Sequence, residues 1–197
     1  MRDLMKTKLS KVAVIRPGHP FRGTIAPASH ASTYAVQVRD INEFGAINTE
    51  QLITTELTGK KQPDYLKEED ILFVAKGAKH FATYVQQLPE QSVCSPHFFI
   101  VRIKPQYAEK VLPEFISWQL NQLAAQRYLK NSAEGSLYVS IRRKILEDTP
   151  ITVPSLATQQ RIVALYRSAV KEQKALQQLI ANRQQQLNVI AHDLFSH

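Results

Sequence analysis

The sequence has 197 residues, 44% of them hydrophobic and 21% charged, a balance typical of a folded protein rather than of a disordered segment. It contains no run of about eighteen apolar residues and no apolar core behind its charged start, so we expect neither a membrane span nor secretion. The single cysteine, Cys94, excludes an intramolecular disulfide bond and is typical of a cytoplasmic protein.

The formal net charge is +8, and the excess of basic side chains lies at the start, in the second half of the region before residue 155, and in the last forty residues. Such an excess favours a polyanionic partner, because each neutralised phosphate releases a counterion. On charge alone, a solvated basic surface that keeps the protein soluble is an equally good interpretation.

Up to residue 154 the sequence predicts several short strands, one longer helix and one short helix. Five apolar residues at 71–75, flanked by charges, predict a strand buried on both faces. Pro17 and Gly18 end the first strand, and Pro113 and Glu114 suit the first turn of the longer helix. The predicted strands cover 8–15, 33–38, 71–75, 81–86, 97–103 and 149–153, and the predicted helices cover 112–130 and 140–147, with Ser140 as the N-cap of the second.

The last forty residues, from Leu156 to Phe195, contain neither glycine nor proline and predict one helix roughly 60 Å long. Apolar side chains recur in it at alternating steps of four and three, which is the spacing of a coiled-coil seam. Gln173 and Arg183 interrupt this seam, and polar seam residues weaken a coiled coil while fixing its register and orientation. The predicted seam consists of Ile162, Tyr166, Ala169, Gln173, Leu176, Ile180, Arg183, Leu187, Ile190 and Leu194.

These patterns predict an α+β protein: a mixed, strand-rich domain at 1–154 and a long helix at 155–197 that forms an antiparallel coiled coil with a partner. In such a pair Arg183 would lie opposite Gln173 of the other chain, and the helix would serve as a spacer between two domains.

Motifs for catalysis or cofactor binding do not emerge from the sequence. None of the six glycines forms a G-x-G-x-x-G turn, and Cys94 and His97 lack a second pair with zinc spacing. Pro63-Asp64 begins like a nuclease motif, but valine stands where the second carboxylate would be. We therefore expect a protein without catalytic activity, cofactor or metal.

The remaining chemical signal is basic. Three groups of cationic side chains lie at the ends of predicted strands or at the start of a helix, where lysine and arginine could position a protein on DNA phosphates. Solvation of a short helix is the competing interpretation for the third group. The predicted DNA-binding residues are Arg16, His19, Arg22, Lys76, Lys79, His80, Arg142, Arg143 and Lys144, with Ser136 and Tyr138 as further hydrogen-bonding groups.

Several segments of the sequence resemble, in the same order along the chain, those of the specificity (S) subunits of type I restriction-modification systems. The most specific match is the junction at 151–162, Ile-Thr-Val-Pro-Ser-Leu-Ala-Thr-Gln-Gln-Arg-Ile, which is similar to an apolar strand followed by Pro-Pro-Leu-x-Glu-Gln-x-x-Ile. Ser155 replaces a proline of that motif and Thr158 a glutamate. Further similar segments follow the family order: 8–15 with Gly18, 38–41 with Gly45, 66–72 with Gly77, 97–102, 115–120 and Gly135; Glu69 stands at a glycine position of the third.

The resemblance implies a subunit without catalytic activity whose target recognition domain selects the DNA sequence for modification and restriction subunits. The usual family member has two recognition domains separated by two antiparallel helices, whereas this sequence predicts one domain and one helix. It resembles a half subunit, and two copies would read two identical, inverted half-sites. The alternatives are a protein-interaction subunit that pairs with another specificity or modification subunit without reading DNA, and an unrecognised catalytic domain.

Overall fold

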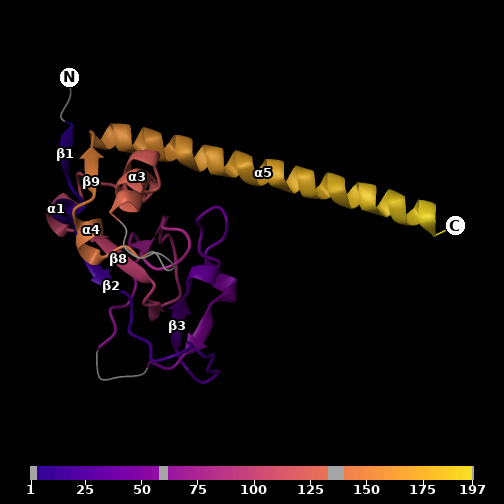
Figure 1. The fold of residues 1–197 in the computed structure, drawn as a ribbon, viewed down its shortest axis with the longest axis horizontal. Helices are drawn as coiled ribbons and strands as arrows, with labels where there is room; N and C mark the ends of the chain where they lie inside the picture. Colours follow the sequence, from indigo (N-terminus) through magenta and orange to yellow (C-terminus); the bar gives the residue numbers. More distant parts are fainter. Residues whose placement is uncertain (1–3, 58–61, 133–139, 197) are drawn as a thin grey trace.

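The structure, a computed structural model, describes residues 4–57, 62–132 and 140–196. A strand-rich domain lies at one end of a single long helix, which projects far beyond it (Figure 1). The domain contains three sheets, with strand orders β2-β8-β5-β6, β4-β3-β7 and β1-β9. The mixed α+β architecture with a long C-terminal helix agrees with the prediction.

The strands are β1 (Met5–Lys8), β2 (Ala13–Pro17), β3 (Thr33–Val36), β4 (Ile53–Thr55), β5 (Ile71–Val74), β6 (Ala82–Tyr84), β7 (Ser92–Cys94), β8 (Phe98–Ile103) and β9 (Pro150–Val153). The helices are α1 (Leu9–Val12), α2 (Pro113–Leu120), α3 (Leu123–Asn131), α4 (Arg143–Glu147) and α5 (Leu156–Phe195). Within the described ranges, no helix has both the length and the apolar character needed to cross a bilayer.

Strand β5 lies between two hydrophobic cores, as its uniformly apolar sequence predicts. Ile71 and Phe73 point into the core that the helices cover, while Leu72 and Val74 point into a second core shared with β3 and β7. All four side chains have 0% exposure. Alternation with period two along a strand buried on both faces explains why this segment shows no polar positions.

The predicted strand over 8–15 is wrong in its middle. One helical turn, α1, separates β1 from β2, and it places Leu9 and Val12 in the core, each at 0% exposure. Their spacing of three residues matches a helical turn, whereas a continuous strand would point them to opposite faces. The amide of Leu9 also donates to the carbonyl of Thr149, which fixes the turn beside β9.

The predicted helix over 112–130 is two helices, because Asn121 leaves the helical path to pair with a strand. Its side-chain amide accepts from the amide of Ala82 and donates to the same residue's carbonyl, both at 2.8 Å, at the start of β6. The second helix then begins after Gln122. The predicted N-cap Ser140 is also wrong: Ser140 forms a β-bridge with Lys76, and Arg142 occupies the N-cap position of α4.

The first turns of α5, called the arm from here on, are fixed firmly to the domain. The side chain of Gln159, at 0% exposure, accepts from the amide of Leu112 at 2.9 Å and donates to the carbonyls of Lys110 and Pro154 at 2.8 Å each. Val163 packs into the helix-covered core, and the guanidinium of Arg167 donates to both oxygens of Glu114 on α2. The direction of the arm is therefore set by the domain.

Candidate nucleic-acid interface

The order of the central sheet brings two of the three predicted basic loops to one edge. β8 lies between β2 and β5 and runs antiparallel to both, so the C-terminal ends of β2 and β5 meet where β8 begins. The amide of Gly18, just after β2, donates to the carbonyl of Phe98, and the amide of Ala75, just after β5, donates to that of His97. The loops that follow β2 and β5 therefore leave the sheet at the same end, one on each side of β8.

The third basic group joins the same edge through Ser140. The bridge between Lys76 and Ser140 is continued by a hydrogen bond of 2.9 Å from the amide of Ile141 to the carbonyl of Ala75. The start of α4 therefore follows directly on the loop after β5. We use the name basic edge for the exposed basic residues of these three segments and of the start of β8: Arg22, Lys76, Lys79, His97, Arg142 and Arg143.

The cations of the basic edge differ in how far they are already neutralised. Arg22, Lys76 and Lys79 are exposed, and no ion pair to another described residue involves them. Arg143, by contrast, is paired with Glu147 at 2.7 Å, one turn along α4. The cations of the loops therefore remain available for phosphate, while Arg143 would have to exchange a partner.

Lys144 belongs to a different cluster, beside β1. It and Lys8 both approach the carboxylate of Asp148, at 3.2 and 3.0 Å. Hydrogen bonds from Lys8 and Lys144 hold the pKa of Asp148 below its usual value. These contacts support the interpretation that this part of α4 is a solvated face.

Three predicted DNA-binding residues have other partners or lie inside the domain. His19 is only 7% exposed, and its ring meets that of Phe21 edge-on at 4.9 Å. His80 is half-buried, with Nδ1 3.0 Å from the carbonyl of Val74. Arg16 donates to Asp64 at 2.9 Å. Burial therefore makes direct phosphate contacts by the two histidines unfavourable, and Ser136 and Tyr138 lie outside the described residues.

The partner of Arg16 belongs to a carboxylate–guanidinium network that the sequence analysis did not anticipate. Arg102 on β8 donates to both oxygens of the fully buried Asp70 at 2.6 Å and also to Asp64 at 3.3 Å. Partial burial raises the pKa of Asp64, but the hydrogen bond from Arg16 and the charge of Arg102 outweigh it, so its pKa lies below the usual value. The network ties the loop before β5 to β2 and β8. The sequence singled out Arg16, Asp64 and the 66–72 and 97–102 segments, but no local pattern linked them to one another.

The far part of the arm has an apolar surface that no described residue of this chain covers. Ile162 and Tyr166 of the predicted seam are half-buried against the domain, but from Ala169 to Leu194 every predicted seam residue is exposed. Two further leucines that were not predicted, Leu165 and Leu179, are 72% and 59% exposed beside it. The exposed seam therefore comprises Leu165, Ala169, Leu176, Leu179, Ile180, Leu187, Ile190 and Leu194, with Gln173 and Arg183 as its polar positions.

Successive residues of a helix are rotated by about 100°, which separates the seam from the face that meets the domain. Gln159, Val163 and Val170 point toward the domain, and the exposed seam lies about a third of a turn away from them. A partner helix could therefore pair with the seam without displacing the domain.

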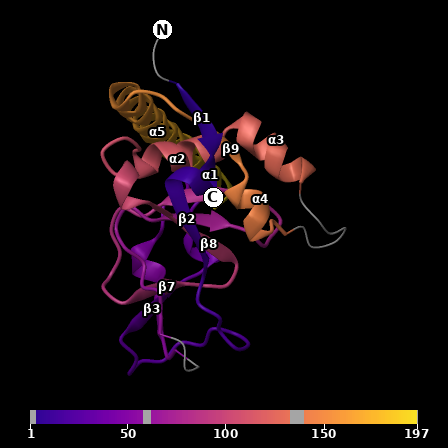
Figure 2. The same cartoon turned by 90° about the vertical axis from the view of Figure 1, so that its left-hand side faces the viewer.

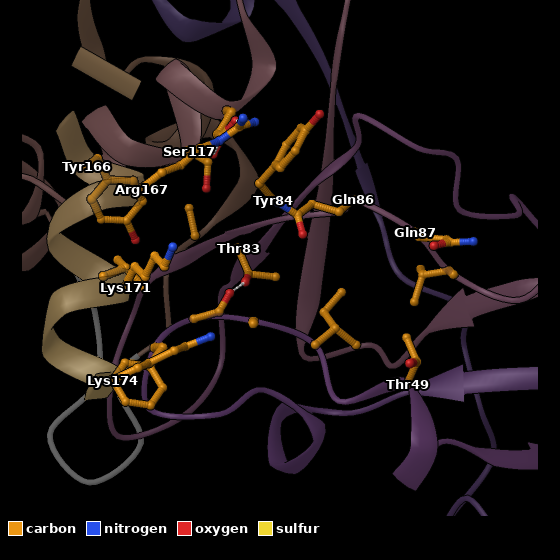
Figure 3. A pocket seen from close by; sticks show the side chains of 18 of the residues that line it. Thr49, Thr83, Tyr84, Gln86, Gln87, Ser117, Tyr166, Arg167, Lys171 and Lys174 are labelled. Carbon is orange, nitrogen blue, oxygen red and sulfur yellow. Dashed lines mark hydrogen bonds and ion pairs between the residues drawn. The ribbon is translucent and has the colours of Figure 1, made fainter. Parts of the chain in front are cut away.

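A groove of about 790 Å³ lies between the arm and the domain. Figure 3 shows Lys171 and Lys174 on the arm, facing β6 and the loop that contains Gly45. The ammonium of Lys174 lies 5.1 Å from the centre of the Phe44 ring, and the hydroxyl of Thr83 donates to the carbonyl of Gly45. The loop that carries Phe44 and Gly45 thus meets the arm well beyond its first turns and supports its direction.

Residues 33–188 match the family described as "Type I restriction modification DNA specificity domain". The chain belongs to this family. Its match begins at β3 and continues through most of the arm, so it includes residues of both the domain and the arm. A search of curated proteins finds no match.

Three solved structures share the fold of this specificity-family chain. The S subunit of a type I restriction-modification system from M. genitalium has a TM-score of 0.63 at 15% identity, and HsdS from Thermoanaerobacter tengcongensis has 0.66 at 18%. A chain from a structure on complex assembly and conformational transition of the type I R-M system has 0.67 at 17%. They cover 99%, 95% and 95% of this chain, which spans only 46%, 47% and 43% of theirs.

Proposed function

We propose that this chain is a half-length specificity subunit, without catalytic activity of its own, that selects the DNA target for the modification and restriction subunits of a type I system. The observation that carries the proposal is an arm fixed by hydrogen bonds to a domain with a basic edge, while its far part presents an apolar seam. In this proposal residues 1–154 read DNA, and residues 155–197 pair with a second copy and set the distance between two readers.

The apolar area of the exposed seam is large enough for a stable antiparallel pair. Burial of its large leucine and isoleucine side chains in two copies would remove roughly 1,500 Å² from water, within the range of stable interfaces. If Arg183 of one copy lies opposite Gln173 of the other, the two-fold axis passes near Gln178. A two-fold pair presents the same domain twice in inverted orientation, so the target would have two identical, inverted half-sites.

The arm also gives an estimate of the half-site spacing. The domain contacts the arm from Gln159 to Lys174, and the middle of this stretch lies about twelve residues from the axis. At 1.5 Å per residue, the two domains would be offset along the arms by about 36 Å, close to one turn of B-DNA. Half-site centres about ten base pairs apart are the expected outcome.

A binding titration tests the reading of DNA. Duplexes carrying the target should bind the chain together with its modification subunit, with an affinity that falls steeply as salt increases. Replacing both Lys76 and Lys79 with alanine should lower the slope of log K against log salt by about two, since each removes one phosphate contact. Lys171→Ala, on the arm, is the matched control; an unchanged slope in the double variant would count against the basic edge.

A second candidate function, pairing with another specificity or modification subunit without reading DNA, has one observation in its favour. Arg16, Arg143 and Lys144 already have carboxylate partners, so part of the basic surface is neutralised within the chain. This candidate gives tight association through the arm and no difference in affinity between target and scrambled duplexes in the same titration.

A further inference from the structure

We propose a second contact between the two copies of the pair: the far end of each arm docks on the β1–β9 sheet of the other copy. The proposal rests on the antiparallel pairing proposed above and adds a binding site for Leu194 and Phe195. These residues are 74% and 89% exposed, the highest values among the large hydrophobic side chains of the described residues.

The antiparallel register brings this end to the start of the partner's arm. With the axis near Gln178, Leu194 lies opposite Ile162 of the other copy and Phe195 opposite its Arg161. The β1–β9 sheet lies beside the first turns of the arm in both views (Figures 1 and 2). It joins the arm directly, because β9 ends at Val153 and α5 begins at Leu156.

This part of the domain carries an apolar patch of its own. Leu4 is 59% exposed and Met5, paired with Val153 across the sheet, is 37% exposed. Ile162 is half-buried at the same end of the arm. Two small apolar surfaces, one at each end of the arm, would therefore meet twice in a two-fold pair, and each meeting would remove both surfaces from water.

The side of the arm on which Phe195 lies agrees with this contact. Phe195 is about a quarter of a turn from Leu194, on the flank of the seam that also includes Gln159 and Val170, which point toward the domain. A two-fold axis perpendicular to both helices keeps this flank on one side of the pair. Leu194 would thus face the partner's arm, while Phe195 would overhang the partner's domain beside β1.

The charges at the two surfaces are complementary. The end of a helix carries a partial negative charge, and Asp193 adds a carboxylate that is 74% exposed. On β1, Lys6 is exposed and pairs with no described carboxylate. Arg161 donates to the carbonyl of Ala157 one turn earlier and, within the described ranges, forms no ion pair. The partial negative charge of the helix end would therefore lie near Lys6, whereas Asp193, about 160° around the helix from Phe195, would lie on the other flank, beside Arg161 of the partner's arm.

Disulfide trapping of the full-length chain tests the contact. Cys94 is fully buried and burial raises the pKa of its thiol, so the native cysteine should stay unreactive. Under mild oxidation the double variant Met5→Cys/Phe195→Cys should form a covalent dimer. Each single variant should not, because equivalent positions of the two copies, such as residue 195, lie about 50 Å apart along the arms.

A control at the axis separates this inference from the dimer itself. Leu179→Cys lies near the two-fold axis and should link two copies whenever the seams pair. Linkage through residue 179 without linkage between 5 and 195 would overturn the docking contact while leaving the dimer intact. Absence of both, with a monomer in sedimentation, would overturn the pairing and the docking contact together.

Equilibrium sedimentation gives a second readout. Phe195→Ala should weaken dimerisation by about tenfold, since the variant loses the contact twice per dimer. Val189→Ala is the matched control, because Val189 is 54% exposed on the opposite flank of the arm and should leave the dissociation constant unchanged. Equal effects of the two substitutions would contradict the proposal.

Discussion

The two halves of the arm differ in what surrounds them. The near half is held by the domain through the buried amide of Gln159, the packing of Val163 and the pairing of Arg167 with Glu114. The far half touches nothing else among the described residues, yet Leu176, Ile180 and other apolar side chains remain exposed along one line. The near half therefore belongs to the fold, and we propose that the far half pairs with a second copy.

The same division separates stability from association. Substitutions in the near half should change unfolding of the domain, and substitutions in the far half should change pairing without changing the domain.

The largest effect is expected for Ile180→Asp, which would place a carboxylate in the middle of the seam of both copies. Burial of unpaired carboxylates is so costly that the dimer dissociation constant should rise by about 1,000-fold, measured by sedimentation. The thermal midpoint of the domain should not change. Val189→Asp, exposed on the opposite flank, is the control and should leave pairing intact.

Gln159→Ala, in the near half of the arm, should lower the stability of the folded domain by a comparable free energy. It removes three hydrogen bonds and leaves the amide of Leu112 and two carbonyls without partners inside the protein. We expect a loss of about 2–4 kcal/mol in the free energy of unfolding, measured in urea. Gln178→Ala, exposed on the same helix, should change it by less than about 0.5 kcal/mol. Equal losses would mean that the amide does not hold the arm.

Glu69→Gly should stabilise the domain without affecting the arm. Glu69 has φ = 68°, in the left-handed region that glycine adopts without strain, and it stands at a glycine position of the family motif. We expect a gain of about 1 kcal/mol in unfolding free energy and an unchanged dimer dissociation constant. Glu68→Gly, the neighbouring exposed residue, serves as the control and should not stabilise.

The smallest effect concerns Asp64 and depends on pH. Its folded pKa is depressed, so its contribution to stability is complete above the ordinary carboxyl value of 3.8 and is lost as the pH falls through the folded pKa. Asp64→Asn should therefore cost less than about 1 kcal/mol at neutral pH, because the pair is partly exposed, and nothing in strong acid. A loss that persists in strong acid would contradict an ionic origin.

Sequence patterns predicted the elements whose signal is local. The arm follows from forty residues without glycine or proline, and β5 follows from an apolar run between charges. By contrast, β4 and β7 have three residues each and form a sheet only by pairing with β3, so no local pattern marks them. The break between α2 and α3 also has a non-local cause, because the side chain of Asn121 is hydrogen-bonded to Ala82, 39 residues away.

The candidate interface shows the same limit. The sequence indicated three basic groups, and the strand order brings two loops and the start of α4 to one edge. The sequence could not show that Arg16 is held by Asp64, 48 residues away, or that His19 is buried. On the arm, the sequence predicted the line of apolar residues whose far part the structure leaves exposed. It did not show that Tyr166 is half-buried against the domain, because both faces of the helix are apolar there.

Methylome sequencing tests the proposed function most directly. Cells that express this chain with its modification subunit should methylate a target with two identical, inverted half-sites whose centres lie about ten base pairs apart. The same cells with Ile180→Asp should lose that methylation. A methylation pattern that does not change when the gene is added or removed would contradict the account.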